Sequence, residues 1–315
     1  MNDIKFSIII PAFKEQYLEY AIKSVLCQKY DNWELIILND RSPYNLDTIV
    51  LKFGDKRIRY LINEENIGAE NVVNNWNKCL DVCTGDYVIC MGDDDALHED
   101  CLSVYLRYIN NYPEVSLFHT RSIIIDEYNV PQYITNSRPE KESIYSLMKH
   151  RMIEEQFIGD FCFKSTTLRR RGGFFYLPLA WGSDDVSAYL CAMDGGVVNV
   201  QLPVFYYRKS TINITSTGNV GKKLDSLNTL YEWYMLFLKQ VPDAFVDKLE
   251  RASVLNRIEK YFFQRKAEDL SMDIRLNYFH VISWIFRKKR YSLSISCILY
   301  GLLISLFVRN RKRHS

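Results

Sequence analysis

The chain has 315 residues, of which 48% are hydrophobic and 14% aromatic, and it carries 40 basic and 38 acidic side chains. This length and apolar content favour one large folded domain with an appendage and exclude a largely disordered chain. The net charge of +2 is uneven, because residues 281–315 hold eight Lys and Arg and no acid, which indicates a tail attracted to an anionic surface rather than a nucleic-acid-binding body.

The eight cysteines mostly lie in apolar runs and form no Cys-x-x-Cys pair, and no secretory signal precedes the first apolar run. We therefore expect a reduced, cytoplasmic protein. The five histidines show no zinc-type spacing, so each is expected to be structural or exposed.

The first part of the chain alternates apolar runs with helical patterns. Residues 6–13 and 34–40 are predicted strands, and residues 15–28 between them carry apolar side chains at helical spacing. A short helix to about residue 53, a strand over 59–62, a turn at 66–68 and a helix to about residue 80 follow. This alternation predicts βαβ units and a mostly parallel, doubly wound α/β sheet.

The next predicted strand, residues 86–91, ends in Gly92 and three consecutive carboxylates, Asp93, Asp94 and Asp95. In open α/β sheets, ligands bind at the carboxyl ends of the strands. Adjacent acids repel one another unless a cation compensates them, and Mg²⁺ or Mn²⁺ is the oxygen-preferring partner that we expect. A solvated acidic turn that caps the next helix is the alternative.

Beyond the acids, residues 98–110 and 143–151 predict helices, and residues 115–126 predict one or two strands. The polar stretch 129–142 contains two prolines and is the expected loop over the site. The stretch 157–179 is rich in aromatic residues.

A second acidic site begins at Asp184 and Asp185, which precede an apolar helical pattern. The pair fits the N-terminus of a buried helix, where the dipole and free N–H groups stabilise anions, and this structural interpretation stands beside a catalytic one. Residues 203–210 then form a predicted strand that ends in the basic pair Arg208 and Lys209.

Five short motifs lie in register across about ninety residues: Ile8-Ile9-Ile10-Pro11-Ala12-Phe13, Ser24-Val25-Leu26-x-Gln28, Asn39-Asp40-x-Ser42, Asn66-Ile67-Gly68 and Gly92-Asp93-Asp94-Asp95. Together they resemble the nucleotide-binding half of a family 2 glycosyltransferase with the GT-A fold, of the type found in bacterial polysaccharide biosynthesis. The resemblance implies a nucleoside-diphosphate sugar, usually UDP-linked, that lies across the strand ends.

The resemblance also assigns residues to this nucleotide. The implied nucleotide-binding residues are Pro11, Ala12, Phe13, Glu15, Asp40, Asn66, Gly68, Asp93 and Asp94, and the implied ligands of Mn²⁺ or Mg²⁺ are Asp94 and Asp95. A uracil N–H is the expected donor to Asp40, although a turn-capping role for this carboxylate and a plain turn at residues 66–68 are the competing interpretations.

Two positions depart from the family pattern. Gly92 stands where the first Asp of the usual Asp-x-Asp-Asp would be, so the metal and ribose roles must be shared among Asp93, Asp94 and Asp95, of which Asp94 and Asp95 are favoured near the metal. Val73 stands where many members carry an arginine that contacts the diphosphate. Another cation must replace that arginine. Arg208 and Lys209 are the candidates, with a solvated charge pair as the alternative.

The acceptor side of the implied site lies about ninety residues after Asp95. There Asp184 and Asp185 match the family's Glu-Asp motif, whose second acid is the catalytic base. The match implies that Asp185 is the base that removes the proton of an acceptor hydroxyl. This hydroxyl attacks the anomeric carbon and inverts its configuration. Trp181 is a candidate to stack on a sugar, although aromatic residues at this density more often lie in a core.

The C-terminal part is helical in pattern from about residue 222 to 286. Residues 291–308 carry no charge, and as a helix they would span roughly 27 Å at ~1.5 Å per residue, slightly less than a bilayer core of ~30 Å. Basic clusters flank both ends, whereas a spanning helix keeps its excess Lys and Arg on one side. We therefore expect a helix that lies on an anionic membrane surface, ahead of packing against protein or spanning.

These patterns predict a catalytic domain over residues 1–217, with a nucleotide-sugar half to about residue 110 and an acceptor half over 111–217, and a helical extension over 218–315. The expected activity is metal-dependent transfer from a UDP-sugar to a glycan or lipid-linked acceptor in surface polysaccharide synthesis. The expected location is the cytoplasmic, inner face of the cell membrane.

Two other functions stay open on the sequence. A nucleotidyltransferase would release pyrophosphate and is expected to have a Gly- and Lys/Arg-rich loop near the first strand, for which Lys14 is a poor substitute. A non-catalytic subunit would bind a UDP-sugar without turning it over.

Overall fold

The computed structural model of the chain describes residues 3–210 and 219–311, with side chains described as far as Phe307. Contacts divide the chain into two compact units. Among the described residues, the first unit holds residues 3–176 and 183–210, and the second holds residues 177–182 and 219–311. The segment 177–182 therefore belongs to the second unit, although the sequence predicts it within the catalytic domain.

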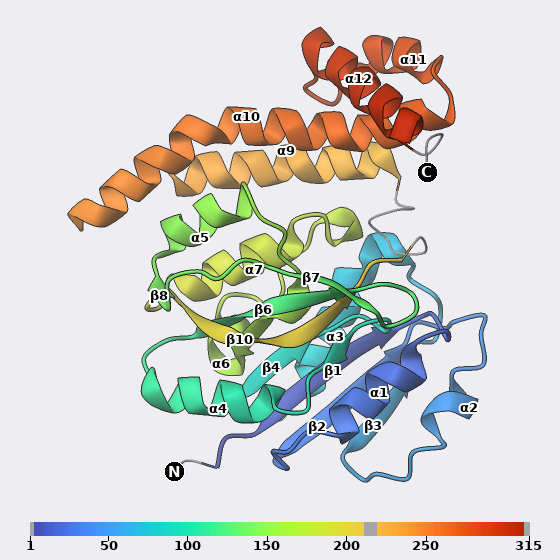
Figure 1. The fold of residues 1–315 in the computed structure, drawn as a ribbon, viewed down its shortest axis with the longest axis vertical. Helices are drawn as coiled ribbons and strands as arrows, with labels where there is room; N and C mark the ends of the chain where they lie inside the picture. Colours follow the sequence, from blue (N-terminus) through green and yellow to red (C-terminus); the bar gives the residue numbers. More distant parts are fainter. Residues whose placement is uncertain (1–2, 211–218, 312–315) are drawn as a thin grey trace. The chain divides into compact units, whose positions relative to one another are not determined.

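A mixed sheet forms the centre of the first unit and has ten strands within the described residues (Figure 1). The strands are β1 (Phe6–Ala12), β2 (Trp33–Asn39), β3 (Ile58–Ile62), β4 (Tyr87–Cys90), β5 (Ala96–Leu97), β6 (Leu117–Ile125), β7 (Pro131–Ile134), β8 (Lys141–Glu142), β9 (Phe161–Lys164) and β10 (Val197–Arg208). Their order is β3-β2-β1-β4-β9-β6-β10-β5, with β7 paired to β6 and β8 paired to β10.

Helices connect the strands of the first unit, and helices alone form the second unit. In the first unit they are α1 (Leu18–Leu26), α2 (Asp47–Val50), η1 (Ala69–Asn71), α3 (Val72–Val82), α4 (Cys101–Asn111), α5 (Ile144–Arg151), η2 (Ile158–Asp160), α6 (Ser165–Arg170) and α7 (Ser183–Ala192). In the second unit they are η3 (Pro178–Ala180), α9 (Val220–Phe237), α10 (Phe245–Leu276), α11 (His280–Arg287) and α12 (Ile295–Arg311).

The N-terminal strands have the predicted doubly wound, parallel arrangement. β1 is parallel to β2 and β4, and β2 is parallel to β3. Ala12 pairs with Asn39, which pairs with Ile62, so three neighbouring strands end level with one another. Beyond β4 the sheet changes character, because β9 is antiparallel to both β4 and β6.

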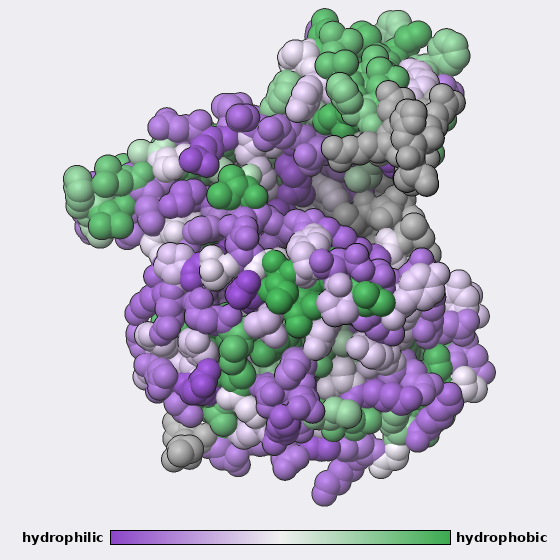
Figure 2. Space-filling view, in the orientation of Figure 1, coloured by the Kyte–Doolittle hydropathy of each residue, from purple (hydrophilic) through white to green (hydrophobic). Residues whose placement is uncertain are grey.

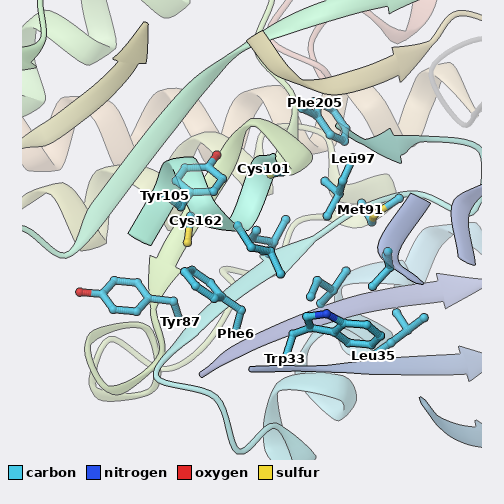
Figure 3. Packing of buried hydrophobic residues seen from close by; sticks show 14 of the residues in the cluster. Phe6, Trp33, Leu35, Tyr87, Met91, Leu97, Cys101, Tyr105, Cys162 and Phe205 are labelled. Carbon is cyan, nitrogen blue, oxygen red and sulfur yellow. The ribbon is translucent and has the colours of Figure 1, made fainter. Parts of the chain in front are cut away.

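The core explains why these strands appear in the sequence as continuous apolar runs. Every residue of β2 and β4 is buried, so both faces of the sheet are covered there. Figure 3 shows Phe6, Trp33 and Tyr87 from the parallel strands together with Tyr105 of α4 and Phe205 of β10. These side chains are at most 4% exposed, so residues far apart in the sequence share one core.

The prediction of a loop over residues 129–142 is wrong for two segments. β7 pairs with β6, and β8 pairs with β10, so their backbone groups are bonded within the sheet. Arg138 between them is buried, and its guanidinium donates to Glu154 Oε2 at 2.9 Å and to Gln156 Oε1 at 3.1 Å. All four residues of β7 are exposed, which is why no apolar alternation marks this strand in the sequence.

The second unit is helical, as predicted. α9 and α10 lie alongside each other (Figure 1), and the predicted helical pattern is interrupted between them at residues 238–244. Leu270, Trp284 and Ile298 share a buried cluster, so α12 packs partly against protein. The uncharged stretch is helical only from Ile295, and none of the described helices combines the length and apolar character needed to cross a membrane.

Candidate functional site

The acidic loop between β4 and β5 joins the turn that follows β1. Asp93, Asp94 and Asp95 are all buried. Asp93 Oδ2 accepts hydrogen bonds from the main-chain N–H groups of Phe13 at 2.8 Å and Lys14 at 2.7 Å. Because β1 and β4 are parallel neighbours, their carboxyl ends meet at the same edge of the sheet. The acidic loop and the turn after β1 therefore lie together at this edge.

The side chain of Lys14 lies among these carboxylates. Its Nζ is 3.2 Å from Asp93 Oδ1 and 2.5 Å from Asp94 Oδ2. Burial lowers the pKa of the ammonium group, but the two carboxylates outweigh burial, and the pKa of Lys14 is raised above its ordinary value. No sequence pattern had assigned this cation to the site. The available signal was its position two residues after β1, the strand beside β4.

The third carboxylate is bound to the backbone. Asp95 Oδ2 accepts from the N–H of Gly92 at 3.1 Å, and Asp95 Oδ1 accepts from the N–H of Arg208 at 3.0 Å. Burial, with the negative charge of Asp94, raises the pKa of Asp95 well above its usual range. The carboxylate thus links the acidic loop to the end of β10.

The guanidinium of Arg208 is fully buried beneath the acidic loop. Its Nε donates to the carbonyl oxygen of Asp94 at 2.8 Å, and Nη1 donates to the carbonyl oxygen of Asp126 at 2.8 Å. Its Nη2 donates to Asn129 Oδ1 at 2.7 Å, and its Cζ lies 4.0 Å from the centre of the Tyr17 ring. Arg208 lies at the predicted site, but protein oxygens already bind its guanidinium, and its contact with a phosphate stays a prediction.

Gly92 creates the space in which two of the carboxylates converge. A Cβ at this position would lie 2.7 Å from Asp94 Oδ1 and 2.9 Å from Asp95 Oδ2, closer than side chains tolerate. Glycine at the place of the usual first Asp therefore has a physical reason. Any side chain there would push the two carboxylates apart.

Asp94 Oδ1 and Asp95 Oδ2, the oxygens near Gly92, belong to the predicted metal site. In the part of the chain that the structure describes, no group of three or more His, Cys, Asp and Glu side chains is arranged to hold a metal ion. Mg²⁺ commonly binds one or two carboxylates and completes its shell with water and substrate phosphates. Asp94 Oδ1 and Asp95 Oδ2 lie 2.7 Å and 2.9 Å from the position of a Cβ at residue 92, so two carboxylate oxygens are available near one point, and their role as ligands of such an ion stays a prediction.

Asp40, at the end of β2, organises a neighbouring turn. Its Oδ1 accepts from Asn63 Nδ2 at 2.7 Å and from the N–H of Ile67 at 3.1 Å. Its Oδ2 accepts from Asn66 Nδ2 at 3.2 Å and from the N–H of Gly68 at 3.1 Å. Gly68 has a φ of 76°, a left-handed conformation that glycine adopts without strain. The turn-capping role is thus present, and the contact of Asp40 with a base stays a prediction.

The other predicted nucleotide contacts follow the end of β1. Ala12 is buried, Pro11 is half-buried, and Glu15 is exposed. Phe13 is 41% exposed and meets the ring of Tyr44 edge-on, with ring centres 6.4 Å apart. An exposed aromatic pair at a strand end suits stacking on a flat ring.

The predicted base, Asp185, lies in the first turn of α7 and is fully buried. Its Oδ1 accepts from Arg151 Nε, at the end of α5, at 2.5 Å. Its Oδ2 is buried and finds no hydrogen-bond donor among the residues described. Buried polar atoms without partners are rare, and a carboxylate that must take a proton needs one oxygen open. Asp184 beside it is half-buried.

A second buried acid lies near this pair. Asp160 of η2 accepts from the hydroxyl of Ser122 and from the N–H of Phe157 at 2.8 Å. Its Oδ2 is 3.9 Å from His119 Nε2. Burial, helped by the negative charge of Asp184, raises the pKa of Asp160 to about 7. Asp160 was not a predicted site residue, because nothing in its local sequence pattern indicates burial of its carboxyl group.

Trp181 belongs to the second unit. Its Nε1 donates to Asp269 Oδ2 at 3.0 Å, and the ammonium group of Lys223 lies 4.2 Å from its ring centre. Ser226 Oγ also donates to the carbonyl oxygen of Pro178 at 2.9 Å, so this segment is bound to α9 and α10. The stacking of Trp181 on a sugar stays a prediction.

The chain is similar in sequence to one family of enzymes and to several bacterial glycosyltransferases. The sequence model described as "Glycosyl transferase family 2" matches residues 7–174. A Campylobacter jejuni protein described as GalNAc(5)-diNAcBac-PP-undecaprenol beta-1,3-glucosyltransferase is 31% identical over 173 residues, which cover 53% of this chain and 54% of that protein. Escherichia coli WfgD, described as UDP-Glc:alpha-D-GlcNAc-diphosphoundecaprenol beta-1,3-glucosyltransferase, is 31% identical over 145 residues, which cover 44% and 56%. The chain thus spans little more than half the length of either relative.

Solved structures resemble the chain over more of its length. Residues 1–349 of Staphylococcus aureus TarS, in complex with UDP-GlcNAc, match with a TM-score of 0.60 and 17% identity over 88% of this chain and 75% of that one. Mannosyltransferase PcManGT from Pyrobaculum calidifontis, in complex with GDP-Man and Mn²⁺, matches with a TM-score of 0.56 and 16% identity over 96% and 87%. At these identities the likeness is one of fold.

Proposed function

Because the chain belongs to glycosyl transferase family 2 and has the GT-A fold with a C-terminal helical extension, we propose that it transfers a sugar from a nucleoside-diphosphate sugar to an acceptor hydroxyl. The proposed donor is a UDP-sugar, and the proposed acceptor is a glycan or lipid-linked glycan in bacterial surface polysaccharide synthesis. The names of two relatives, which describe glucosyltransferases with undecaprenol-linked acceptors, support this acceptor class.

One observation carries the donor side of the proposal. The main-chain N–H groups of Phe13 and Lys14 bind Asp93, so the turn after β1 and the acidic loop form one edge. Asp40 and the turn that it caps follow β2, which ends level with its neighbour β1 at the same edge of the sheet. We assign the nucleobase of the donor to the part of the site near Phe13 and Asp40, and the diphosphate of the donor to the acidic loop.

A divalent ion is part of the proposal, with Asp94 and Asp95 as the residues that would hold Mn²⁺ or Mg²⁺. When bound, such an ion supplies a Lewis acid that stabilises the departing nucleoside diphosphate. The chain's own contribution is to hold the two carboxylates over Gly92 and to fix Asp95 through the N–H of Arg208.

On the acceptor side, we assign the general base to Asp185. Arg151 holds Oδ1 in place, and Oδ2 is left to accept the proton of the acceptor hydroxyl. A single in-line attack on the anomeric carbon inverts its configuration. The carboxylate must become accessible when substrates bind, because it is fully buried without them.

We place the protein on the cytoplasmic face of the cell membrane, attached through the end of its helical unit. Figure 2 shows hydrophobic residues gathered over α11 and α12. Phe279, Ile282 and Phe286 follow helical spacing and are 78%, 54% and 84% exposed. The basic run 287–290 comes directly after them, and apolar side chains with adjacent cations suit an anionic lipid surface.

The experiment that tests the activity is a donor panel in which free nucleoside diphosphate is measured with and without Mn²⁺, in the presence of undecaprenol-linked acceptors. UDP release with one sugar nucleotide, coupled to a heavier acceptor, is the expected result. Pyrophosphate release would instead indicate a nucleotidyltransferase, and saturable UDP-sugar binding with no turnover on any acceptor would indicate a binding subunit.

A further inference from the structure

Lys14 has an unusual position for a cation beside a proposed metal site. Its main-chain N–H is fixed on Asp93 Oδ2, while its Nζ reaches Asp94 Oδ2 at 2.5 Å. Among the described residues, no main-chain N–H donates to the Asp94 carboxylate, in contrast to Asp93 and Asp95. The ammonium group of Lys14 therefore contacts Asp94, the acid of the three whose carboxylate has no main-chain donor among the described residues.

The charges at this edge of the sheet explain why a cation is needed. Three adjacent buried carboxylates repel one another, and the Lys14 ammonium offsets part of that repulsion. A divalent ion on Asp94 and Asp95 would compensate the same charge. An ammonium group and a metal ion cannot both stay close to Asp94 without mutual repulsion, so each weakens binding of the other.

The nucleotide offers the displaced cation a new partner. The Arg208 guanidinium, a second cation at this edge of the sheet, is held by protein oxygens. The Lys14 side chain is 23% exposed and has a flexible four-carbon stem, so its ammonium can leave Asp94.

We propose that Lys14 is a resident counter-ion of the acidic loop, which competes with the divalent ion for Asp94 and moves to the diphosphate when the nucleotide sugar binds. The diphosphate part of this inference rests on the proposed function. Two consequences follow: the free divalent ion binds weakly, and the ion and the nucleotide strengthen each other's binding, because the nucleotide removes the competing ammonium.

The test measures metal binding directly, by electron paramagnetic resonance titration of Mn²⁺ without nucleotide, in the full chain and in Lys14→Met. We expect the variant to bind Mn²⁺ at least about tenfold more tightly, because a positive charge at contact distance is removed. Lys14→Arg, which keeps the charge, is expected to bind as weakly as the unaltered protein. Lys23→Met is the matched control, because Lys23 pairs with Glu19 on the surface of α1.

A second titration tests the diphosphate contact. Without metal, UDP is expected to bind Lys14→Met at least about tenfold more weakly than the unaltered protein, while Lys23→Met binds normally. Unchanged or weaker Mn²⁺ binding by folded Lys14→Met would overturn the competition, and so would tight Mn²⁺ binding by Lys14→Arg. Unchanged UDP binding would overturn the transfer to the diphosphate. A failure of every donor to turn over would refute the proposed activity, while the Mn²⁺ titration would still decide the role of Lys14.

Discussion

The main-chain N–H of Arg208 lies 3.0 Å from Asp95 Oδ1, so the end of β10 closes on the acidic loop that follows β4. The guanidinium of the same residue donates to the carbonyl oxygen of Asp94, so backbone and side chain hold the loop together. One residue thus joins segments more than a hundred positions apart in the sequence. The acidic loop is therefore held by the fold as well as by its own sequence.

Replacing Arg208 should destabilise the first unit. Arg208→Met removes the hydrogen bonds that a fully buried guanidinium donates to Asp94, Asp126 and Asn129 and leaves these acceptors unpaired, which costs about 2–4 kcal/mol. The measurement is the free energy of unfolding in urea, followed with a probe of the first unit. Lys209→Met is the control, because the Lys209 side chain is 47% exposed and its ion pair with Glu155 should contribute less than about 1 kcal/mol. Equal losses in the two variants would contradict the role given to Arg208.

Replacing Asp185 should abolish transfer without abolishing donor binding. Asp185→Asn keeps the shape of the side chain but removes the proton acceptor, so turnover should fall about 10²- to 10⁴-fold. Nucleotide release is the measure of turnover, and calorimetric titration with UDP is the measure of donor binding. Asp184→Asn, at the half-buried neighbour, is the matched variant and should keep more activity. An Asp185→Asn protein that retains full turnover would remove the catalytic role.

The strands and the edge where the acids lie could be predicted, because the signal is local. β2 and β4 are buried on both faces, so β2 is built around the continuous apolar run 35–38 and β4 is apolar throughout, and polar residues follow both runs. Parallel order then places Asp40 and Asp93 at one edge. The helical second unit was predictable for a similar reason. In α9 and α10, apolar residues recur at helical spacing among polar ones, and no glycine or proline interrupts the central turns.

The partners of the site residues could not be predicted, because they depend on tertiary register. Lys14 and Asp94 are eighty positions apart, and their contact follows from the pairing of β1 with β4. Arg151 and Asp185 meet because α5 packs against α7. β7 was missed because all its residues are exposed, so the strand leaves no hydrophobic alternation in the sequence.

Adding a methyl group at Gly92 should disrupt the proposed metal site. In Gly92→Ala the new Cβ would lie 2.7 Å from Asp94 Oδ1 and 2.9 Å from Asp95 Oδ2, so the carboxylates must move apart. We expect Mn²⁺ binding in the presence of UDP to weaken at least about tenfold, since a metal ion requires its ligands within a few tenths of an ångström. Gly54→Ala is the control, because nothing lies within 4 Å of its added Cβ. Normal Mn²⁺ binding by Gly92→Ala would place the metal ligands elsewhere.

The buried carboxyl group of Asp160 should make stability depend on pH. Burial raises its pKa from 3.8 to about 7, so the folded state binds the proton more tightly than the unfolded state. The resulting stabilisation is complete below pH 3.8 and is lost as pH rises through about 7. Relative to Asp160→Asn, the unaltered protein should therefore lose about 1.4 kcal/mol of unfolding free energy per pH unit across this window.

Urea unfolding of the first unit at pH 5, 6 and 8 is the measurement for Asp160. The difference between the unaltered protein and Asp160→Asn is informative, because other carboxyl groups contribute equally to both. Asp31→Asn is the control, since the Asp31 side chain is 93% exposed and its removal should leave the pH profile unchanged. Parallel profiles for the unaltered protein and Asp160→Asn would mean that the carboxyl group is solvated in the folded state.

The exposed face of α11 should determine membrane attachment. Phe279 and Phe286 are 78% and 84% exposed, and the basic run 287–290 follows Phe286 directly. Burying a phenylalanine in lipid contributes about 1.5–3 kcal/mol, so Phe286→Glu should weaken binding to vesicles containing anionic lipid by about tenfold or more. Co-sedimentation at low and high salt is the measurement, and higher salt should weaken binding because the lysines and arginines act through screened charges. Leu51→Glu, at a position in the first unit that is 74% exposed, is the matched control and should bind like the unaltered protein. Equal binding of Phe286→Glu and Leu51→Glu would show that α11 does not contact the lipid.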